Sequence, residues 1–288
     1  MPNLKEIRSR ISSVGSTMQI TSAMKMVSAA KLKRAQDAIT QMRPYSNKLT
    51  EILENLTSTL EGDVGGIYAA QRKPQKVLLV TITSNRGLCG GFNSYIIKSA
   101  EELINKKYSS SKVDVLSIGK KSSEFFNKKG NILKSSHDDL FNTLTFDNVS
   151  IIADKIMQDF VNEEYDKVIL VYNQFKNAAT QIIMNEDYLP IQNKSSNNQE
   201  DKKDYIFEPD KNKIVQNLIP KSLKTQLFKA ILDSHAAEHG ARMTAMHKAT
   251  DNASELKKEL TLTYNKARQA AITGEILEIV GGAEALNN

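Results

Sequence analysis

The sequence has no tryptophan, one cysteine, six prolines and only 6% aromatic residues. A single cysteine, Cys89, excludes an intramolecular disulfide and is typical of a protein from a reducing compartment. No apolar run approaches the roughly 18 residues of a membrane-spanning helix, and the N-terminus has no apolar segment typical of a secretory signal. With 288 residues the chain has room for one or two domains. We expect a soluble protein without direct membrane insertion.

Positive charge is concentrated at the N-terminal end. The whole chain has 39 Lys and Arg against 33 Asp and Glu, which gives a formal net charge of +6. Residues 1–48 hold nine basic and two acidic side chains, so their own balance is 9 − 2 = +7. Nucleic acid, acidic lipid and acidic protein surfaces are the three classes of partner that such a segment attracts.

Apolar residues in the first 60 positions recur at intervals of three and four, which is typical of a coiled-coil helix. The spacing holds from Leu4 to Met18 and resumes from Ala35 to Leu56. Between these stretches the stripe shifts, and we expect the seam to pass through Ile20, Met24 and Val27. Pro44 lies inside the pattern and predicts a kink or an interruption there.

A second helical segment begins after Pro220 and extends to Val280. Its stripe consists mainly of small residues, which permit a close approach of another helix or of a surrounding surface. The stripe is Ala253, Leu256, Leu260, Thr263, Ala267, Ala270, Gly274, Leu277 and Gly281. A helix this long needs a partner to cover its seam. We expect an antiparallel pair formed by the two chain ends, and a homodimer fits the same spacing.

The middle of the chain predicts an α/β domain with a parallel sheet, because strand-like and helix-like runs alternate. The expected strands are Lys76–Thr83, Val113–Gly119 and Lys167–Phe175, with Thr180–Met184 as a further edge strand. The expected helices are Phe92–Lys107, Lys120–Lys129 and Asp147–Glu164. Residues 192–203 are strongly polar and predict a solvated loop.

Two motifs point to chemistry, and each has a simpler explanation. The glycine-rich segment Ser84–Asn93 follows a strand and opens a helix, as phosphate-binding loops do, but its glycine spacing fits no nucleotide-binding motif. A strand-to-helix turn needs glycine in any case. His235, Glu238 and His239 form the H-x-x-E-H pattern of a zinc peptidase, yet no third ligand is identifiable. A solvated helix face explains that pattern equally well.

Three strings together resemble the gamma subunit of the rotary proton-translocating ATP synthase. They are KEIRSRISSV…ITSAMKMVSAAKLKRAQ at the start, SNRGLCGGFN after the first strand, and ARMTAMHKATDNASELKKELTLTYNKARQAAITGEILEIVGGAEAL at the end. The stretch Tyr205–Asp210 is similar to the family's entry into its C-terminal helix. Cys89 as the only thiol and the absence of a transit peptide before Lys5 favour the bacterial type.

The resemblance implies a fold of mixed α+β and α/β class. A long antiparallel two-helix coiled coil would combine residues 1–62 and 209–288, with an inserted Rossmann-like α/β domain at 63–208. It implies a non-catalytic central-stalk rotor that couples ion-driven rotation of the c ring to the three catalytic beta sites, without cofactor or metal. The implied partners are the hexamer of three alpha and three beta subunits, the epsilon subunit and the c ring. The implied location is peripheral, at the cytoplasmic face of the bacterial inner membrane, and nucleic acid is not an expected partner. A basic coiled-coil module that binds nucleic acid is the alternative.

The resemblance also implies site residues, matched one by one to the family's motifs. Those expected to couple the rotor to its surroundings are Met24, Lys31, Lys33, Arg34, Arg268, Gln269 and Thr273. Among them, the three basic residues would face an acidic lever of the beta subunits, and the last three would form a polar catch with a beta loop. Tyr205 and Glu208 are expected to contact the c ring. Arg242 belongs to the ARM motif of the C-terminal helix, and the sequence does not reveal its contact.

Overall fold

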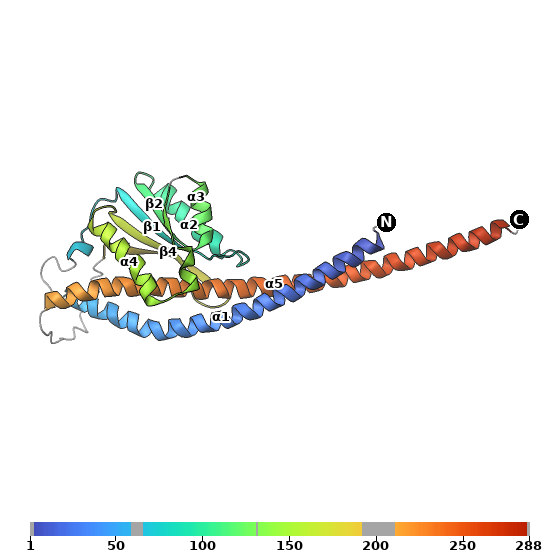
Figure 1. Ribbon diagram of the computed structural model, residues 1–288, viewed down its shortest axis with the longest axis horizontal. Coiled ribbons are helices and arrows are strands. Elements are labelled where there is room, and N and C mark those ends of the chain that lie inside the picture. The colour runs from blue at the N-terminus through green and yellow to red at the C-terminus, as the bar shows by residue number, and fades with distance from the viewer. Residues whose placement is uncertain (1–2, 59–65, 131, 192–210, 287–288) are drawn as a thin grey trace. The chain divides into compact units, whose positions relative to one another are not determined.

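The computed structural model describes residues 3–58, 66–130, 132–191 and 211–286 (Figure 1). Internal contacts divide the chain into two units, one of residues 1–28 with 243–288 and one of residues 29–242. The expected domain boundaries at 62/63 and 208/209 lie outside the described residues. None of the helices in the described part of the chain combines the length and the apolar character that crossing a bilayer takes.

Two long helices begin and end the described chain. Helix α1 spans Leu4–Ser58 and is continuous through Pro44, so the predicted interruption at this proline is wrong. Helix α5 spans Lys211–Leu286 and includes Pro220, so it begins ten residues before the predicted Lys221. In proteins most of the stability of a helix comes from packing of its apolar face and not from propensity, so both long helices depend on what covers their seams.

The unit of residues 29–242 contains a five-stranded sheet, which confirms the Rossmann-like class. The strands are β1 (Lys76–Ile82), β2 (Lys112–Ile118), β3 (Leu133–Ser136), β4 (Lys167–Phe175) and β5 (Gln181–Leu189), in the order β3-β2-β1-β4-β5. The first four are parallel, and β5 runs antiparallel to β4 at an edge. The sequence did not predict β3, because its four residues LKSS lack the apolar side chains that indicate a strand.

Helices cover both faces of this sheet (Figure 1). One face packs against α2 (Phe92–Glu102), which continues as a π-helical turn η2 (Leu103–Lys107), and against α3 (Lys120–Lys128). The other face packs against α4 (Phe146–Val161) and the Ile219–Ile231 stretch of α5. Two short 3-10 turns, η1 (Gly66–Tyr68) and η3 (Asp138–Asn142), complete the unit. Helix α5 is therefore part of the domain core in this unit.

Gly119, between β2 and α3, occupies a position that only glycine tolerates. Its φ is +102°, and a Cβ atom there would lie 2.1 Å from the carbonyl oxygen of Thr83. The close approach lets Thr83 donate its hydroxyl to the Gly119 carbonyl at 3.2 Å, which holds the ends of β1 and β2 together.

In the unit of residues 1–28 and 243–288, α1 and α5 run antiparallel. The Thr250 hydroxyl donates to the Thr21 hydroxyl at 2.8 Å, and the Lys257 side chain lies over Gly15. The paired positions move in opposite directions along the two helices, which defines an antiparallel register. This arrangement confirms the two-helix coiled coil.

The seam of α1 does not shift, so the predicted course through Ile20, Met24 and Val27 is wrong. Those side chains are 55%, 41% and 57% exposed. Buried and half-buried side chains instead keep the three-four spacing through Leu4, Ile7, Ile11, Val14, Met18, Thr21, Lys25 and Ser28. Polar residues fit this seam because their hydroxyls bond to their own helix, as Thr21 does to the Thr17 carbonyl at 3.0 Å and Ser28 to the Met24 carbonyl at 2.7 Å.

The predicted stripe of α5 is also partly wrong, because here too a polar residue takes an inward position. Ala253 and Leu260 face inward as expected, but Leu256 is 46% exposed. The inward position belongs to the next residue, Lys257, whose ammonium end lies against Gly15 of α1. In both helices the apolar residues that interrupt the seam point outward.

Candidate functional site

The basic residues Lys31, Lys33 and Arg34 lie on the exposed side of α1. Between and beyond them Leu32, Ala35 and Ile39 are buried, which fixes the orientation of the three charges. Lys33 forms an exposed ion pair with Asp37 at 3.0 Å. Within the described ranges, Lys31 and Arg34 have no ion-pair partner of their own. At least two of the three charges are therefore available to another molecule.

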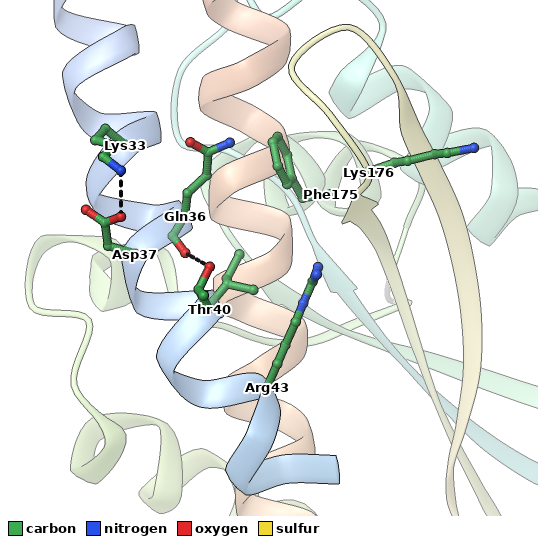
Figure 2. A pocket seen from close by; sticks show the side chains of 8 residues that line it. Lys33, Gln36, Asp37, Thr40, Arg43, Phe175 and Lys176 are labelled. Carbon is green, nitrogen blue, oxygen red and sulfur yellow. Dashed lines mark hydrogen bonds and ion pairs between the residues drawn. The ribbon is translucent and has the colours of Figure 1, made fainter.

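A pocket of about 290 Å³ continues this basic side of α1 (Figure 2). Its walls come from α1 and from the end of β4 with the residue that follows it. The lining residues are Lys33, Gln36, Asp37, Ile39, Thr40, Arg43, Phe175 and Lys176. Three of them are cationic and one is acidic, but the ion pairs of Lys33 and Arg43 leave little free positive charge for an anionic ligand. Its lining holds no nucleophile–base pair and no pair of carboxylates suited to acid–base catalysis.

Arg43, at the edge of the pocket, is engaged in a partly buried ion pair that joins α1 to α5. Its guanidinium lies 3.4 Å from the Asp233 carboxylate, and the Asp233 side chain is fully buried. Burial raises the pKa of Asp233, and the Arg43 charge opposes this rise. The Asp233 Oδ2 atom has no hydrogen-bond partner in the described part of the chain. Removing Arg43 would leave an uncompensated buried acid, so its role here is structural.

The H-x-x-E-H pattern lies inside the domain, not on a solvated face. The Nε2 atoms of His235 and His239 are 3.1 Å apart, and the His235 ring stacks on Phe141 at 5.7 Å between centroids. Glu238 pairs with Arg242 at 2.5 Å. The described residues contain no group of three or more potential metal ligands. The three residues therefore serve the packing of α5, and the geometry gives no support to a zinc-peptidase site.

Burial keeps both histidines neutral at physiological pH. It lowers the pKa of His235 to about 4 and that of His239 to about 3, because a charged imidazolium is poorly solvated there. The positive charges of Lys31 on α1 and Arg242 on α5 add to the effect on His239, as does His235 itself. With both rings neutral, the Nε2–H of one ring donates to the Nε2 of the other, so the pair satisfies one hydrogen bond without a charge.

The glycine-rich loop after β1 is closed by its own side chains. The Asn93 side chain accepts from the Ser84 amide at 2.9 Å and donates to the buried Cys89 sulfur at 3.2 Å. Leu88 and Gly90 both have positive φ angles, which turn the chain sharply. Burial raises the pKa of the Cys89 thiol, so a reactive thiolate is disfavoured. The loop has neither a phosphate cradle nor an activated nucleophile.

The expected site residues of the other unit are all exposed. Met24 lies on α1, and Arg268, Gln269 and Thr273 share the outer part of α5. Thr273 donates its hydroxyl to the Gln269 carbonyl at 3.0 Å, one turn away. The Thr21–Thr250 register puts Met24 near residue 247, about 30 Å along α5 from Arg268. The structure therefore brings the last three residues together and separates them from Met24.

Among the described residues, the outer end of α5 has no helical partner. By the same register Leu4, the first residue of α1, lies opposite residue 267, so α5 continues beyond the start of α1. Its large exposed apolar residues are Ile272, Ile276, Leu277, Ile279 and Val280. Apolar side chains on such a lone helix indicate a surface that another protein covers.

The sequence did not identify the orientation or contact of some residues, and others lie outside the described part of the chain. Tyr205, Glu208 and the loop 192–203 are outside the described residues. The exposed Ile20 and Val27 were predicted as seam residues, and their break from the three-four spacing was the signal that they face outward. The contact of Arg242 has no sequence signal, because its partners are backbone carbonyls of a distant loop.

Known proteins provide a consistent comparison. A family model described as ATP synthase matches residues 3–286. The ATP synthase gamma chain of Flavobacterium johnsoniae is 64% identical over 289 aligned residues that cover both chains completely. A chain in the central stalk and c-ring structure of Tetrahymena thermophila mitochondrial ATP synthase is 27% identical, with a TM-score of 0.62 over 80% of this chain and 99% of that chain. A chain in the rotor of Euglena gracilis mitochondrial ATP synthase has a TM-score of 0.68 at 22% identity, covering 93% of this chain and 98% of that chain, and this likeness concerns the fold.

The buried histidine pair predicts acid sensitivity below pH 6.5. The unfolded chain takes up protons near pH 6.5, whereas the folded histidines stay neutral to about pH 4 and about pH 3. Their contribution to stability is therefore complete above pH 6.5 and is lost as the pH falls. Below pH 6.5 the slope of the free energy of unfolding against pH rises toward about 1.4 kcal/mol per pH unit for each histidine, because the unfolded histidine is then protonated and the folded one is not.

Urea unfolding of the full chain at a series of pH values measures this slope. A His235→Gln/His239→Gln variant should show a flatter profile. The exposed His247 is the control, since His247→Gln should leave the slope unchanged. An equal slope in the double variant and the original chain would contradict the assignment.

Proposed function

The chain belongs to the ATP synthase gamma-chain family, and from this we propose that it acts as the central-stalk rotor of a bacterial ATP synthase. It couples ion-driven rotation of the c ring to conformational cycling of the three catalytic beta sites, and the reverse during hydrolysis. The chain itself catalyses no reaction and uses no cofactor. Its partners are the hexamer of alpha and beta subunits, the epsilon subunit and the c ring. It works at the cytoplasmic face of the inner membrane without entering the bilayer.

One observation carries this proposal on the structural side. The antiparallel pair of α1 and α5 buries a narrow, partly polar seam and turns larger apolar residues outward. A coiled coil that only dimerised or spaced other domains would place those residues in its seam. Apolar side chains around a helix pair, with few directional bonds to offer, suit a part that turns against a surrounding protein surface.

We assign the two groups of described site residues to different contacts. Lys31, Lys33 and Arg34 face an acidic lever of the beta subunits, which accounts for the basic excess of the first 48 residues. Met24 lies in the segment that bears against the surrounding subunits. Arg268, Gln269 and Thr273 form the polar catch with a beta-subunit loop. For Tyr205 and Glu208 the contact with the c ring rests on the family resemblance alone.

The alternative of a nucleic-acid-binding module has no support in the comparisons. A duplex-binding surface needs a basic stripe that stays free to contact phosphates. Lys33 is instead paired with Asp37, and Arg43 with the buried Asp233. We therefore propose no nucleic-acid partner for this chain.

Reversing the three α1 charges should impair coupling while the complex still assembles. In a complex that contains the Lys31→Glu/Lys33→Glu/Arg34→Glu variant, ATP-driven proton pumping should fall about fivefold or more, because like charges then face each other across the interface. Pumping into membrane vesicles and ATP hydrolysis are measured on the same preparation. The matched control reverses Lys120, Lys121 and Lys128 on α3, with the same change in net charge. Unchanged pumping in the α1 variant would refute the lever assignment.

The polar catch has a control on the same helix. Arg268→Ala/Gln269→Ala/Thr273→Val removes three exposed polar groups, and each hydrogen bond to a partner contributes about 1 kcal/mol. ATP hydrolysis by the assembled complex should fall about tenfold or more. Lys258, Glu259 and Thr263 have the same spacing, the same exposure and the same threonine-to-carbonyl bond, here 3.0 Å. The corresponding control variant should retain activity, and equal losses in both variants would contradict a localised catch.

A further inference from the structure

The sheet order defines a crevice in which folds of this class bind ligands. In the order β3-β2-β1-β4-β5 the chain moves from β1 to one side and later returns on the other side with β4. The crevice at the carboxyl ends of these two neighbouring strands is the usual ligand position in doubly wound sheets. Here it is bounded by the β1–α2 loop (Thr83–Gly91) and by the residues after β4, Lys176–Ala178.

A segment of α5, Ser234–Arg242, occupies this crevice. The Ser234 hydroxyl donates to the carbonyl of Ile82, the last residue of β1, at 3.3 Å. Ala237 is fully buried in the cluster formed with α2 and the strands. A Cβ atom on Gly240 would lie 3.2 Å from the Ala178 Cα and 3.4 Å from the Phe175 ring. The close approach of helix and sheet therefore depends on small residues at two successive turns.

The side chains of Glu238 and Arg242 attach this segment to the β1–α2 loop. Arg242 donates one bond to the Gly87 carbonyl and another, at 3.3 Å, to the Arg86 carbonyl. The same guanidinium is held by Glu238 at 2.5 Å, and both side chains are mostly buried. The positive φ angle of Leu88 turns the loop just beyond these two carbonyls. The guanidinium group suits this arrangement, because its two terminal nitrogens can donate to two carbonyls and a carboxylate at the same time.

We propose that Ser234–Arg242 is an internal ligand of the α/β domain, and that Glu238 and Arg242 are positioning residues that make the domain and the Lys211–Arg242 part of α5 turn as one body. This rests on the proposed rotor function. We call the contacts of Arg242 with the β1–α2 loop and with Glu238 the Arg242 clamp. Torque applied to the domain then passes into α5 through this clamp and through the contact of Gly240 with the end of β4, and the helix does not slide in the crevice. Because this segment of α5 fills the crevice, no small-molecule substrate binds there.

The first test concerns the clamp in the free chain and does not depend on the rotor function. Arg242→Gln should speed amide hydrogen exchange in residues 84–91 by about tenfold, because local opening becomes easier. Arg242→Lys should not restore protection, since the single Nζ atom of lysine cannot replace the two separate guanidinium nitrogens that make these bonds. The control is Lys106→Gln, which removes an exposed ion pair of the same helical spacing at 3.5 Å. Unchanged exchange in Arg242→Gln would overturn the clamp.

The second test asks whether helix and domain move together during turnover. Protons pumped per ATP hydrolysed are measured in the assembled complex for the original chain, for Arg242→Gln and for the control Lys106→Gln. The ratio should fall about threefold or more in Arg242→Gln, because the helix is then free to move against the loop, and it should stay unchanged in Lys106→Gln.

The outcomes separate the inference from the proposed function. A ratio that falls as far in Lys106→Gln as in Arg242→Gln would overturn the inference, because the loss would then not depend on the Arg242 contacts. An unchanged ratio in Arg242→Gln would show that Arg242 is not a positioning residue. Failure of the original chain to support any ATP-driven pumping would overturn the proposed function, while the exchange result would still decide the clamp.

Discussion

The pairing of α1 with α5 is the interaction on which the other features of the chain depend. Helices of 55 and 76 residues gain most of their stability from packing of their apolar faces, so each depends on the other where their seams meet. In one unit the seam is a regular antiparallel coiled coil. In the other the same helix α5 also covers one face of the sheet, so the domain core and the helix pair share one element.

The sequence predicted most of the fold because periodicity is a strong signal in long helices and buried strands. The three parallel strands β1, β2 and β4 and the helices α2 to α4 were found within a few residues of their ends. The seam was placed wrongly where polar residues take inward positions. Thr21 and Ser28 satisfy their hydroxyls on their own helix, so apolar periodicity pointed to Ile20 and Val27.

The candidate site was only partly accessible to sequence reasoning, for a related physical reason. Exposed charges such as Lys31 and Arg34 are readable from composition and from a family resemblance. The Arg242 clamp is not, because it uses backbone carbonyls whose position depends on the folded loop. Likewise the sequence alone marks Gly240 as a poor helix former. Only the structure shows that Phe175 and Ala178, at the end of β4 and just after it, approach this position closely. The residues of α5 that these contacts bury are not available to partner proteins, so partners can contact only the surface of α5 that stays exposed.

The central claim is that this chain turns inside an assembly, and rotation can be observed directly. Complexes with alpha and beta subunits are fixed to a surface, and a probe is attached to the exposed end of α3 through Lys128→Cys in a Cys89→Ser chain. On addition of ATP the probe should rotate in one direction, and rotation should stop when ATP is removed. A stationary probe on a complex that retains the chain and hydrolyses ATP would contradict the account.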